Sequence, residues 1–230
     1  MGGRRGCRVA VGIGLVALAV GLGLGPPASA ATVSWVDWTS ASPGSPGSAA
    51  GSATTGSSTV SVTYTGEFFS ANTAGGTNWW ATSSSTYTKP PEVENPPPDS
   101  DIIRLVGGSG IIHTIGFSSP VVDPVMAMLS IGQSALPVSY AFDAPFEILN
   151  VGPGYWGSGT LVELAGDVLE GREGHGLIRF GGTFTSLSWT VPSPENWHGF
   201  TFGFVSVPEP GAAPLLLLGL AGLATARRGR

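Results

Sequence analysis

The chain of 230 residues is rich in glycine and proline, with 36 Gly and 19 Pro, and only 11% of its residues are charged. Its mean hydropathy is +0.25. This length suits one all-β domain or two small ones. Lysine and arginine are too sparse for a surface that tracks phosphates, which excludes nucleic-acid binding. The single cysteine, Cys7, provides neither a disulfide framework nor a cysteine metal site.

Charge is distributed unevenly along the chain. Residues 31–207 hold four basic residues against fourteen acidic ones, a net charge of −10, although the whole chain carries only −5. The other basic residues are at the two ends, and they are Arg4, Arg5, Arg8, Arg227, Arg228 and Arg230. The ends and the middle of the chain therefore serve different purposes.

The N-terminus, residues 1–30, has the features of a cleavable signal peptide. Basic residues 4–8 precede an apolar run over residues 9–24, and the small residues Ala28 and Ala30 then occupy the third and first positions before Ala31. Signal peptidase accepts only small side chains at these positions. The sequence predicts Sec-type export with cleavage after Ala30. A retained signal anchor is the alternative, because the apolar run falls just short of a membrane span.

The C-terminus, residues 207–230, combines three features within a short distance. Pro208, Glu209 and Pro210 precede an apolar run over residues 211–226. The chain then ends in a basic tail, which contains Arg227, Arg228 and Arg230. The apolar run predicts a transmembrane helix, and the basic tail stops it on the cytoplasmic side.

Taken together, these features resemble the PEP-CTERM sorting signal of Gram-negative bacteria. The resemblance implies recognition by the membrane enzyme exosortase and cleavage near residues 208–210. It also implies an inner-membrane intermediate, followed by delivery to the cell surface or to an extracellular matrix that contains exopolysaccharide. Residues 173–204 more loosely resemble the closing strands of the uncharacterised β-sandwich ectodomains that precede such signals, and this likeness implies no activity.

The middle of the chain, residues 31–206, has the pattern of a β-protein. Apolar and small polar residues alternate strictly over Val60–Tyr64 and Phe200–Phe204, which places them on opposite faces of a sheet. Glycine-rich turns separate further β-rich runs, which are 32–38, 101–106, 110–117, 126–131, 138–142, 147–151 and 183–191. This spacing favours an all-β fold, an antiparallel β-sandwich or jelly roll. Residues 160–170 could form a helix face or a strand, and their glycines favour the strand.

Two stretches of the middle are predicted to be flexible loops. Residues 40–58 are almost entirely Ser, Ala, Gly, Thr and Pro and have little to bury. Residues 88–101 contain five prolines and several acidic side chains, which predicts a stiff, extended, solvated loop.

Motifs for enzymatic chemistry are absent from the middle of the chain. Residues 152–157 formally fit a dinucleotide-binding glycine pattern, but Tyr155 and Trp156 would block the approach of a pyrophosphate, and no helix is predicted after them. Serine-hydrolase and zincin motifs are missing. The sequence therefore predicts a protein that is not an enzyme and holds no cofactor.

The three histidines offer only a weak metal-site hypothesis. His113 alternates with the same spacing as Ile111, Ile115 and Phe117, so all four side chains should lie on one face of a strand. This pattern predicts a buried core histidine. His175 and His198 have glycine neighbours and are predicted to lie in turns. No metal site is expected from residues so scattered.

Acidic residues offer two further alternatives. Asp99 and Asp101 could bind Ca²⁺ within their loop, although a solvated acidic loop is the simpler interpretation. Glu163, Asp167 and Glu170 could supply the carboxylate pair of a glycan hydrolase, but nothing in the sequence marks one of them as buried.

Adjacent aromatic residues are the best indication of binding. Trp79 and Trp80 follow a glycine pair, and Tyr155 and Trp156 lie in a glycine-rich turn. Flat exposed rings can stack on the apolar faces of sugars, although these rings could instead plug the ends of a sandwich. We therefore expect a non-catalytic structural or adhesive component of the matrix. A polysaccharide-binding module is the first alternative, and a glycan hydrolase is the second.

Overall fold

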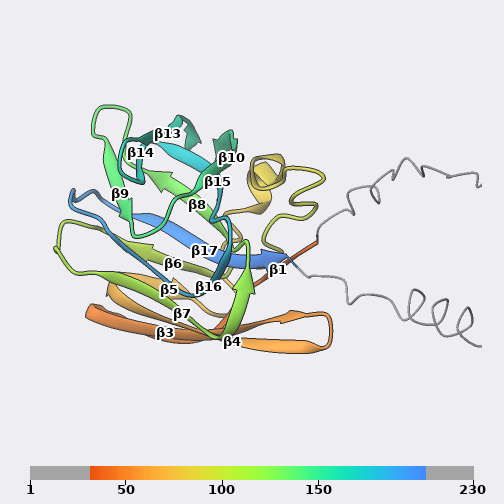
Figure 1. The fold of residues 1–230 in the computed structure, drawn as a ribbon. Helices are drawn as coiled ribbons and strands as arrows, with labels where there is room; N and C mark the ends of the chain where they lie inside the picture. Colours follow the sequence, from red (N-terminus) through yellow and green to blue (C-terminus); the bar gives the residue numbers. More distant parts are fainter. Residues whose placement is uncertain (1–31, 206–230) are drawn as a thin grey trace, which may run out of the picture.

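The computed structural model describes residues 32–205. The predicted signal peptide and its cleavage site at Ala28–Ala31 lie outside the described residues. The same holds for Pro208–Pro210, the predicted membrane span 211–226 and the basic tail. The described chain is all-β and antiparallel, and two large sheets pack face to face as a β-sandwich (Figure 1).

The first sheet has seven strands, in the order β10-β15-β8-β17-β6-β5, with β1 beside the second half of β17. These strands are β1 (Val33–Trp35), β5 (Ser70–Asn72), β6 (Ile102–Leu105), β8 (Val125–Ile131), β10 (Glu147–Val151), β15 (Gly174–Arg179) and β17 (His198–Val205). Since β1 pairs with β17, the first and last strands of the described chain lie side by side.

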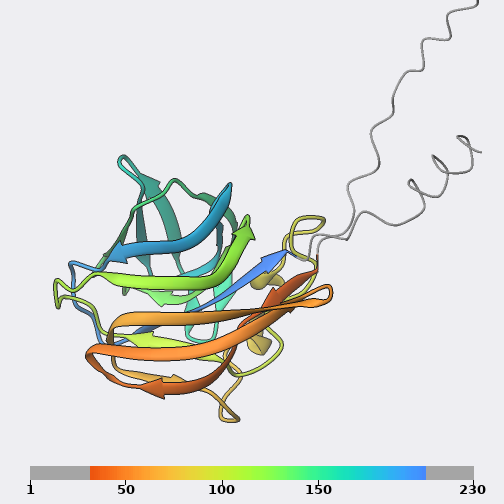
Figure 2. The same ribbon diagram turned by 60° about the horizontal axis from the view of Figure 1, so that its bottom comes forward.

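The second sheet has eight strands, in the order β13-β14-β9-β16-β7-β4-β3-β2, and Figure 2 shows it curving around the core. These strands are β2 (Asp37–Ser42), β3 (Gly44–Thr55), β4 (Ser58–Phe68), β7 (His113–Val122), β9 (Val138–Phe142), β13 (Thr160–Leu164), β14 (Val168–Arg172) and β16 (Thr183–Thr190). A separate small hairpin pairs β11 (Pro153–Gly154) with β12 (Gly157–Ser158).

The main core fills the space between the two sheets and is rich in aromatic rings. Trp189, for example, is 2% exposed and packs edge-on against Phe200 with the ring centroids 5.3 Å apart. The alternating pattern at residues 200–204 delivers Phe200, Phe202 and Phe204 to this core, as the sequence predicts. Burial of so many large apolar side chains is the main stabilising contribution to the fold.

A second, smaller core lies on the outer face of the seven-stranded sheet. The segment 73–101, with the 3₁₀ helix η1 (Ala81–Tyr87), covers this face and buries Trp80 and Tyr87 against it. Every residue of β8 is consequently buried, because Met126 and Met128 enter the main core while Val125, Ala127 and Leu129 enter the second.

One predicted loop belongs instead to three paired strands. Residues 40–58 were expected to be flexible, but they form the end of β2, all of β3 and the start of β4. Only Ala49 and Ala53 of β3 reach the main core. Backbone pairing with β2 on one side and β4 on the other holds the rest, so this prediction was wrong.

The other predicted loop contains no helix or strand but packs closely on the sheet. Residues 88–101 bury Val93 completely, and Lys89 and Val93 form a β-bridge. Asn95 fastens the loop to β1, because its Oδ1 accepts from the Val33 N–H at 2.8 Å and its Nδ2 donates to the Val33 carbonyl at 2.9 Å. The loop is therefore part of the packed structure and not a free solvated segment.

Candidate functional site

Four aromatic rings from three separate segments form one cluster. These residues, the aromatic cluster, are Trp79, Tyr155, Trp156 and Trp197. The rings of Trp79 and Trp156 stack with their centroids 5.0 Å apart. Trp197 meets Trp156 edge-on at 4.4 Å, and Tyr155 meets Trp79 edge-on at 4.7 Å. Tyr155 and Trp156 are 44% and 43% exposed, an unusual exposure for rings so large.

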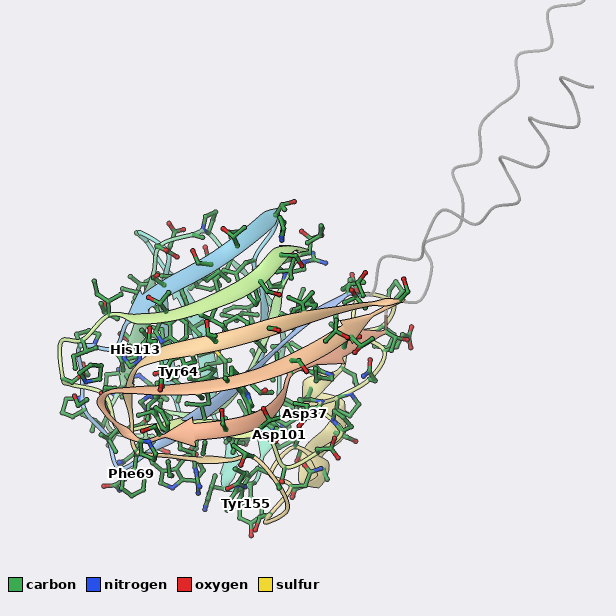
Figure 3. The ribbon with its side chains drawn as sticks, turned by 90° about the horizontal axis from the view of Figure 1, so that it is seen from below. Asp37, Tyr64, Phe69, Asp101, His113 and Tyr155 are labelled. Atoms are coloured by element: carbon green, nitrogen blue, oxygen red, sulfur yellow. The ribbon has the colours of Figure 1, made fainter. Side chains whose placement is uncertain are left out.

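A short hairpin presents the exposed members of the cluster. Tyr155 and Trp156 occupy the turn between β11 and β12, and Figure 3 shows Tyr155 at the margin of the molecule. The Thr86 hydroxyl donates to the Pro153 carbonyl at 2.7 Å, which ties the hairpin to η1. The hairpin also rests on β15, where the Gly152 N–H donates to the His175 carbonyl at 3.2 Å.

The two adjacent tryptophans of the sequence play opposite roles. Trp80 is fully buried in the second core, where its Nε1 donates to the Asp101 carbonyl at 3.2 Å and its ring meets Tyr87 edge-on. The structure therefore removes Trp80 from the predicted glycan-binding residues. Because neighbouring side chains diverge, the anchored Trp80 leaves Trp79 to join the aromatic cluster, half-buried against Trp156.

Two members of the aromatic cluster form one wall of a groove of about 490 Å³. Trp156 and Trp197 line this wall, and polar side chains line the rest. The polar lining residues are Ser130, Gln133, Ser134, Glu173, Glu195 and Asn196. An aromatic wall facing a few polar groups is the usual composition of a small-molecule or sugar site.

A β-bulge aims Ser130 into the groove. Leu129 and Ser130 of β8 lie opposite the single residue His175 of β15, between the pairs Met128–Gly176 and Ile131–Gly174. Ser130 adopts φ of +56° and Glu173 adopts φ of +54°, left-handed conformations that cost a non-glycine residue about 1 kcal/mol or more each. Two such residues side by side in one groove point to a functional constraint.

Hydrogen bonds fix the two glutamates of the groove. The Ser130 hydroxyl donates to Oε1 of Glu173 at 2.6 Å. The Gly132 N–H donates to Oε1 of Glu195 at 3.0 Å, and Nδ1 of His198 contacts the same oxygen. The side chain of Glu195 is only 1% exposed, whereas that of Glu173 is 20% exposed.

The histidines lie in the strands and not in turns. His175 and His198, predicted to be turn residues, are completely buried in β15 and β17. Nδ1 of His175 accepts from the Ser130 N–H at 3.0 Å, and burial lowers the pKa of this ring to about 4. His175 is therefore uncharged at neutral pH.

His113 is a core histidine, as the sequence predicts. It is fully buried, stacks on Trp189 at 5.5 Å, and its Nδ1 lies 2.7 Å from the Tyr64 hydroxyl, the pair labelled in Figure 3. Burial, together with the neighbouring His198, lowers the pKa of His113 to about 4. Within residues 32–205, no group of three or more His, Cys, Asp or Glu side chains is arranged to hold a metal ion.

The acidic residues singled out in the sequence lie outside the groove. Glu163 and Glu170 are on the paired strands β13 and β14, and Asp167 is in the turn between them. Asp99 and Asp101 line a separate cavity of about 30 Å³, together with Asp37. Figure 3 labels Asp37 and Asp101. Burial, with repulsion from Asp37 and Asp99, raises the pKa of Asp101 to about 6.

The structure thus brings together Trp79, Tyr155 and Trp156 of the predicted binding residues, and it adds Trp197, Glu173 and Glu195. The sequence Glu195-Asn196-Trp197 before a predicted strand was the available signal for Glu195 and Trp197. The bulge at Ser130 has no signal in the sequence. Because it depends on pairing between β8 and β15, it could not be predicted from one strand alone.

No helix among residues 32–205 has both the length and the apolar character needed to cross a membrane. Comparisons of the chain with protein-family models, with curated proteins and with solved structures found no match.

Proposed function

We propose that this protein is an exported, surface-sorted component of an extracellular matrix, and that its β-sandwich binds polysaccharide in the aromatic groove. The observation that carries the binding proposal is the exposed ring of Trp156, which stacks on the half-buried Trp79 and lines the groove with Trp197, beside polar groups that hydrogen bonds hold in place. A purely structural role gives no reason for two large rings to stay exposed at the tip of a small hairpin.

The chemistry of the groove fits a sugar chain. Aromatic faces pack on the apolar C–H faces of sugar rings, while carboxylate, amide and hydroxyl groups such as Glu173, Asn196 and Ser130 pair with sugar hydroxyls. The groove is open, so it could hold part of a long polymer. Its openness and its polar lining favour the polysaccharide-binding alternative over the purely structural interpretation.

The binding test uses the purified full chain and a panel of soluble matrix polysaccharides, with affinity measured by calorimetry. We expect at least one polymer to bind and Trp156→Ala to weaken that binding at least tenfold. Phe69→Ala is the matched control, because Phe69 is a 63% exposed aromatic residue outside the groove. Binding of no polymer, or equal losses in the two variants, would overturn the proposal.

The same samples separate binding from catalysis. Glu173 and Glu195 both line the groove, so a glycan hydrolase remains the competing function for this site. A binding module leaves the polymer length unchanged after long incubation. New reducing ends that appear with the wild-type chain and disappear with Glu195→Gln would replace the binding module with a hydrolase.

The sorting proposal rests on the resemblance of residues 207–230 to the PEP-CTERM signal and has its own test. Its partners would be signal peptidase and an exosortase-type enzyme in the membrane. Replacement of Pro208, Glu209 and Pro210 with alanine should leave an unprocessed product in the inner membrane of a host that encodes exosortase. Equal release of the variant and the wild-type chain would contradict the sorting proposal without affecting the binding proposal.

A further inference from the structure

The groove is lined by two glutamates and by no lysine or arginine. The described part of the chain has four basic side chains, Lys89, Arg104, Arg172 and Arg179, and none of them lines the groove. The basic residue nearest in sequence, Arg172, places its Nε 3.5 Å from Oε1 of Glu170 on β14 instead. An anionic sugar such as a uronate or a sulfated residue would therefore meet two carboxylates with no lysine or arginine in the lining to bind its charge.

Each groove glutamate keeps one oxygen free. Oε1 of Glu173 accepts from Ser130, and Oε1 of Glu195 accepts from Gly132 and contacts His198. Among residues 32–205, no hydrogen bond reaches Oε2 of either side chain, although the Glu195 side chain is 99% buried and lines the groove. Neither oxygen is fully buried, so each is open to the groove, where a donor from the ligand can replace water.

Charge compensation from the protein is weak at Glu173. Nε2 of His175 lies 3.5 Å from Oε1 of Glu173, but burial keeps this ring neutral above a pH of about 4. Ser130 donates a hydrogen bond without adding charge. A ligand that brings its own positive charge satisfies this carboxylate best.

We infer that the groove selects an amino sugar, a hexosamine with a free ammonium group, over neutral and anionic sugars. This inference rests on the proposed function and names the class of sugar within it. The ammonium group would donate to the free oxygens of Glu173 and Glu195, and the faces of Trp156 and Trp197 would add cation–π attraction. N-acetylation removes the charge and one of these donors, so it removes most of the selectivity.

The test compares three oligosaccharides of equal length at pH 6 by calorimetry with the purified full chain. These probes are a glucosamine hexamer, an N-acetylglucosamine hexamer and a galacturonate hexamer. We expect the glucosamine hexamer to bind at least tenfold more tightly than its acetylated counterpart, and the galacturonate hexamer not to bind. We also expect Glu173→Gln to lower the ratio of the first two affinities at least threefold while it retains binding of the acetylated hexamer, which shows that the variant is folded.

The control variant removes one negative charge elsewhere. Glu163→Gln makes the same change on exposed β13, so its affinity ratio should match that of the wild-type chain. Equal affinities of the wild-type chain for the two glucosamine-based hexamers, equal effects of the two substitutions, or a preference for galacturonate would overturn the inference and leave the proposed function standing. Failure of all three probes and of every polysaccharide in the panel would instead remove the proposed function itself.

Discussion

Gly154 allows the hairpin of β11 and β12, which carries Tyr155 and Trp156, to pack closely on the His175 ring. A Cβ atom at this position would lie 2.2 Å from Nδ1 of His175, whose ring is completely buried. Since that ring cannot move away, we expect Gly154→Ala to lower the free energy of unfolding by about 1–3 kcal/mol, the usual cost of overpacking. It should also displace Tyr155 and Trp156 and weaken glycan binding. Chemical denaturation and calorimetry measure the two effects.

Gly181 provides the control for this substitution. No atom lies within 4 Å of a Cβ built at Gly181, and its backbone does not need a positive φ. Gly181→Ala should therefore change the stability by less than ~0.5 kcal/mol. Equal stability of the two alanine variants would contradict the close packing of Gly154 on the His175 ring.

Asp101 is a residue whose charge destabilises the fold. Its pKa is about 6 in the folded protein and near its ordinary value of 3.8 in the unfolded chain, so the folded state holds the extra proton between these values. Stability from this group is present below about pH 4 and is lost as the pH rises through 6. We expect Asp101→Asn to stabilise the protein at pH 7 by about 1 kcal/mol, after allowance for screening at this partly exposed site.

Denaturation at two pH values tests this prediction. The stabilising effect of Asp101→Asn should largely disappear at pH 3, where the wild-type side chain is mostly protonated in both states. Glu163→Gln, an exposed acid outside the cavity, should have no such pH-dependent effect. A variant that is less stable than the wild-type chain at pH 7 would contradict the raised pKa.

At the scale of elements, β3 is a strand held chiefly by its backbone. Strand β3 pairs with β2 on one side and with β4 on the other. The N–H of Ala50 therefore lies within a hydrogen-bonded ladder whether it faces β2 or β4. Ala50→Pro removes that donor, and we expect a loss of about 1–3 kcal/mol in denaturation experiments. Ala50→Thr keeps the N–H and should have little effect. If Ala50→Pro left the free energy of unfolding unchanged, this segment would be the flexible loop predicted from its composition.

Elements with apolar alternation could be predicted from the sequence, and elements without it could not. The predicted runs 138–142 and 147–151 coincide with β9 and β10. β3 was missed because its side chains bury almost nothing, and its pairing with β2 and β4 is not visible in its composition. A strand that depends on its neighbours carries little signal of its own.

The misplaced histidines have a related explanation. The glycines beside His175 and His198 predicted turns, but they make room inside the sheet. A Cβ at Gly176 would lie 2.1 Å from the Asn150 carbonyl oxygen, and one at Gly199 would lie 2.4 Å from Cδ1 of Ile102. Glycine permits both a turn and a close approach between chains, and only the paired strand distinguishes the two.

At the scale of the whole molecule, the groove and the exit of the chain lie at opposite ends of one strand. Glu195 and Trp197 immediately precede β17, and the chain leaves β17 at Val205 towards the predicted sorting signal. Seven residue steps along an antiparallel strand span about 23 Å. Under the proposed function, this arrangement would hold the sugar-binding residues away from the membrane while the chain is still anchored.

The molecule as a whole should lose stability in mild acid because two buried histidines resist protonation. His113 and His175 have folded pKa values of about 4, against an ordinary value of 6.5. Between these limits the unfolded chain binds two protons that the folded state excludes, so the free energy of unfolding falls as the pH drops. Asp101 acts in the opposite direction with one proton. We therefore expect a net loss of ~2 kcal/mol from pH 7 to pH 5.

Nuclear magnetic resonance can assign this loss to its source. The Cε1–H signals of His113 and His175 should stay at their neutral positions down to pH 5, while urea denaturation over the same range gives the falling stability. Because His175 accepts the Ser130 N–H, its protonation would also break the hydrogen bond that shapes the bulge in the groove. Signals from these two rings that shift with a midpoint near pH 6.5 would show that water reaches them, and the acid sensitivity would then need another cause.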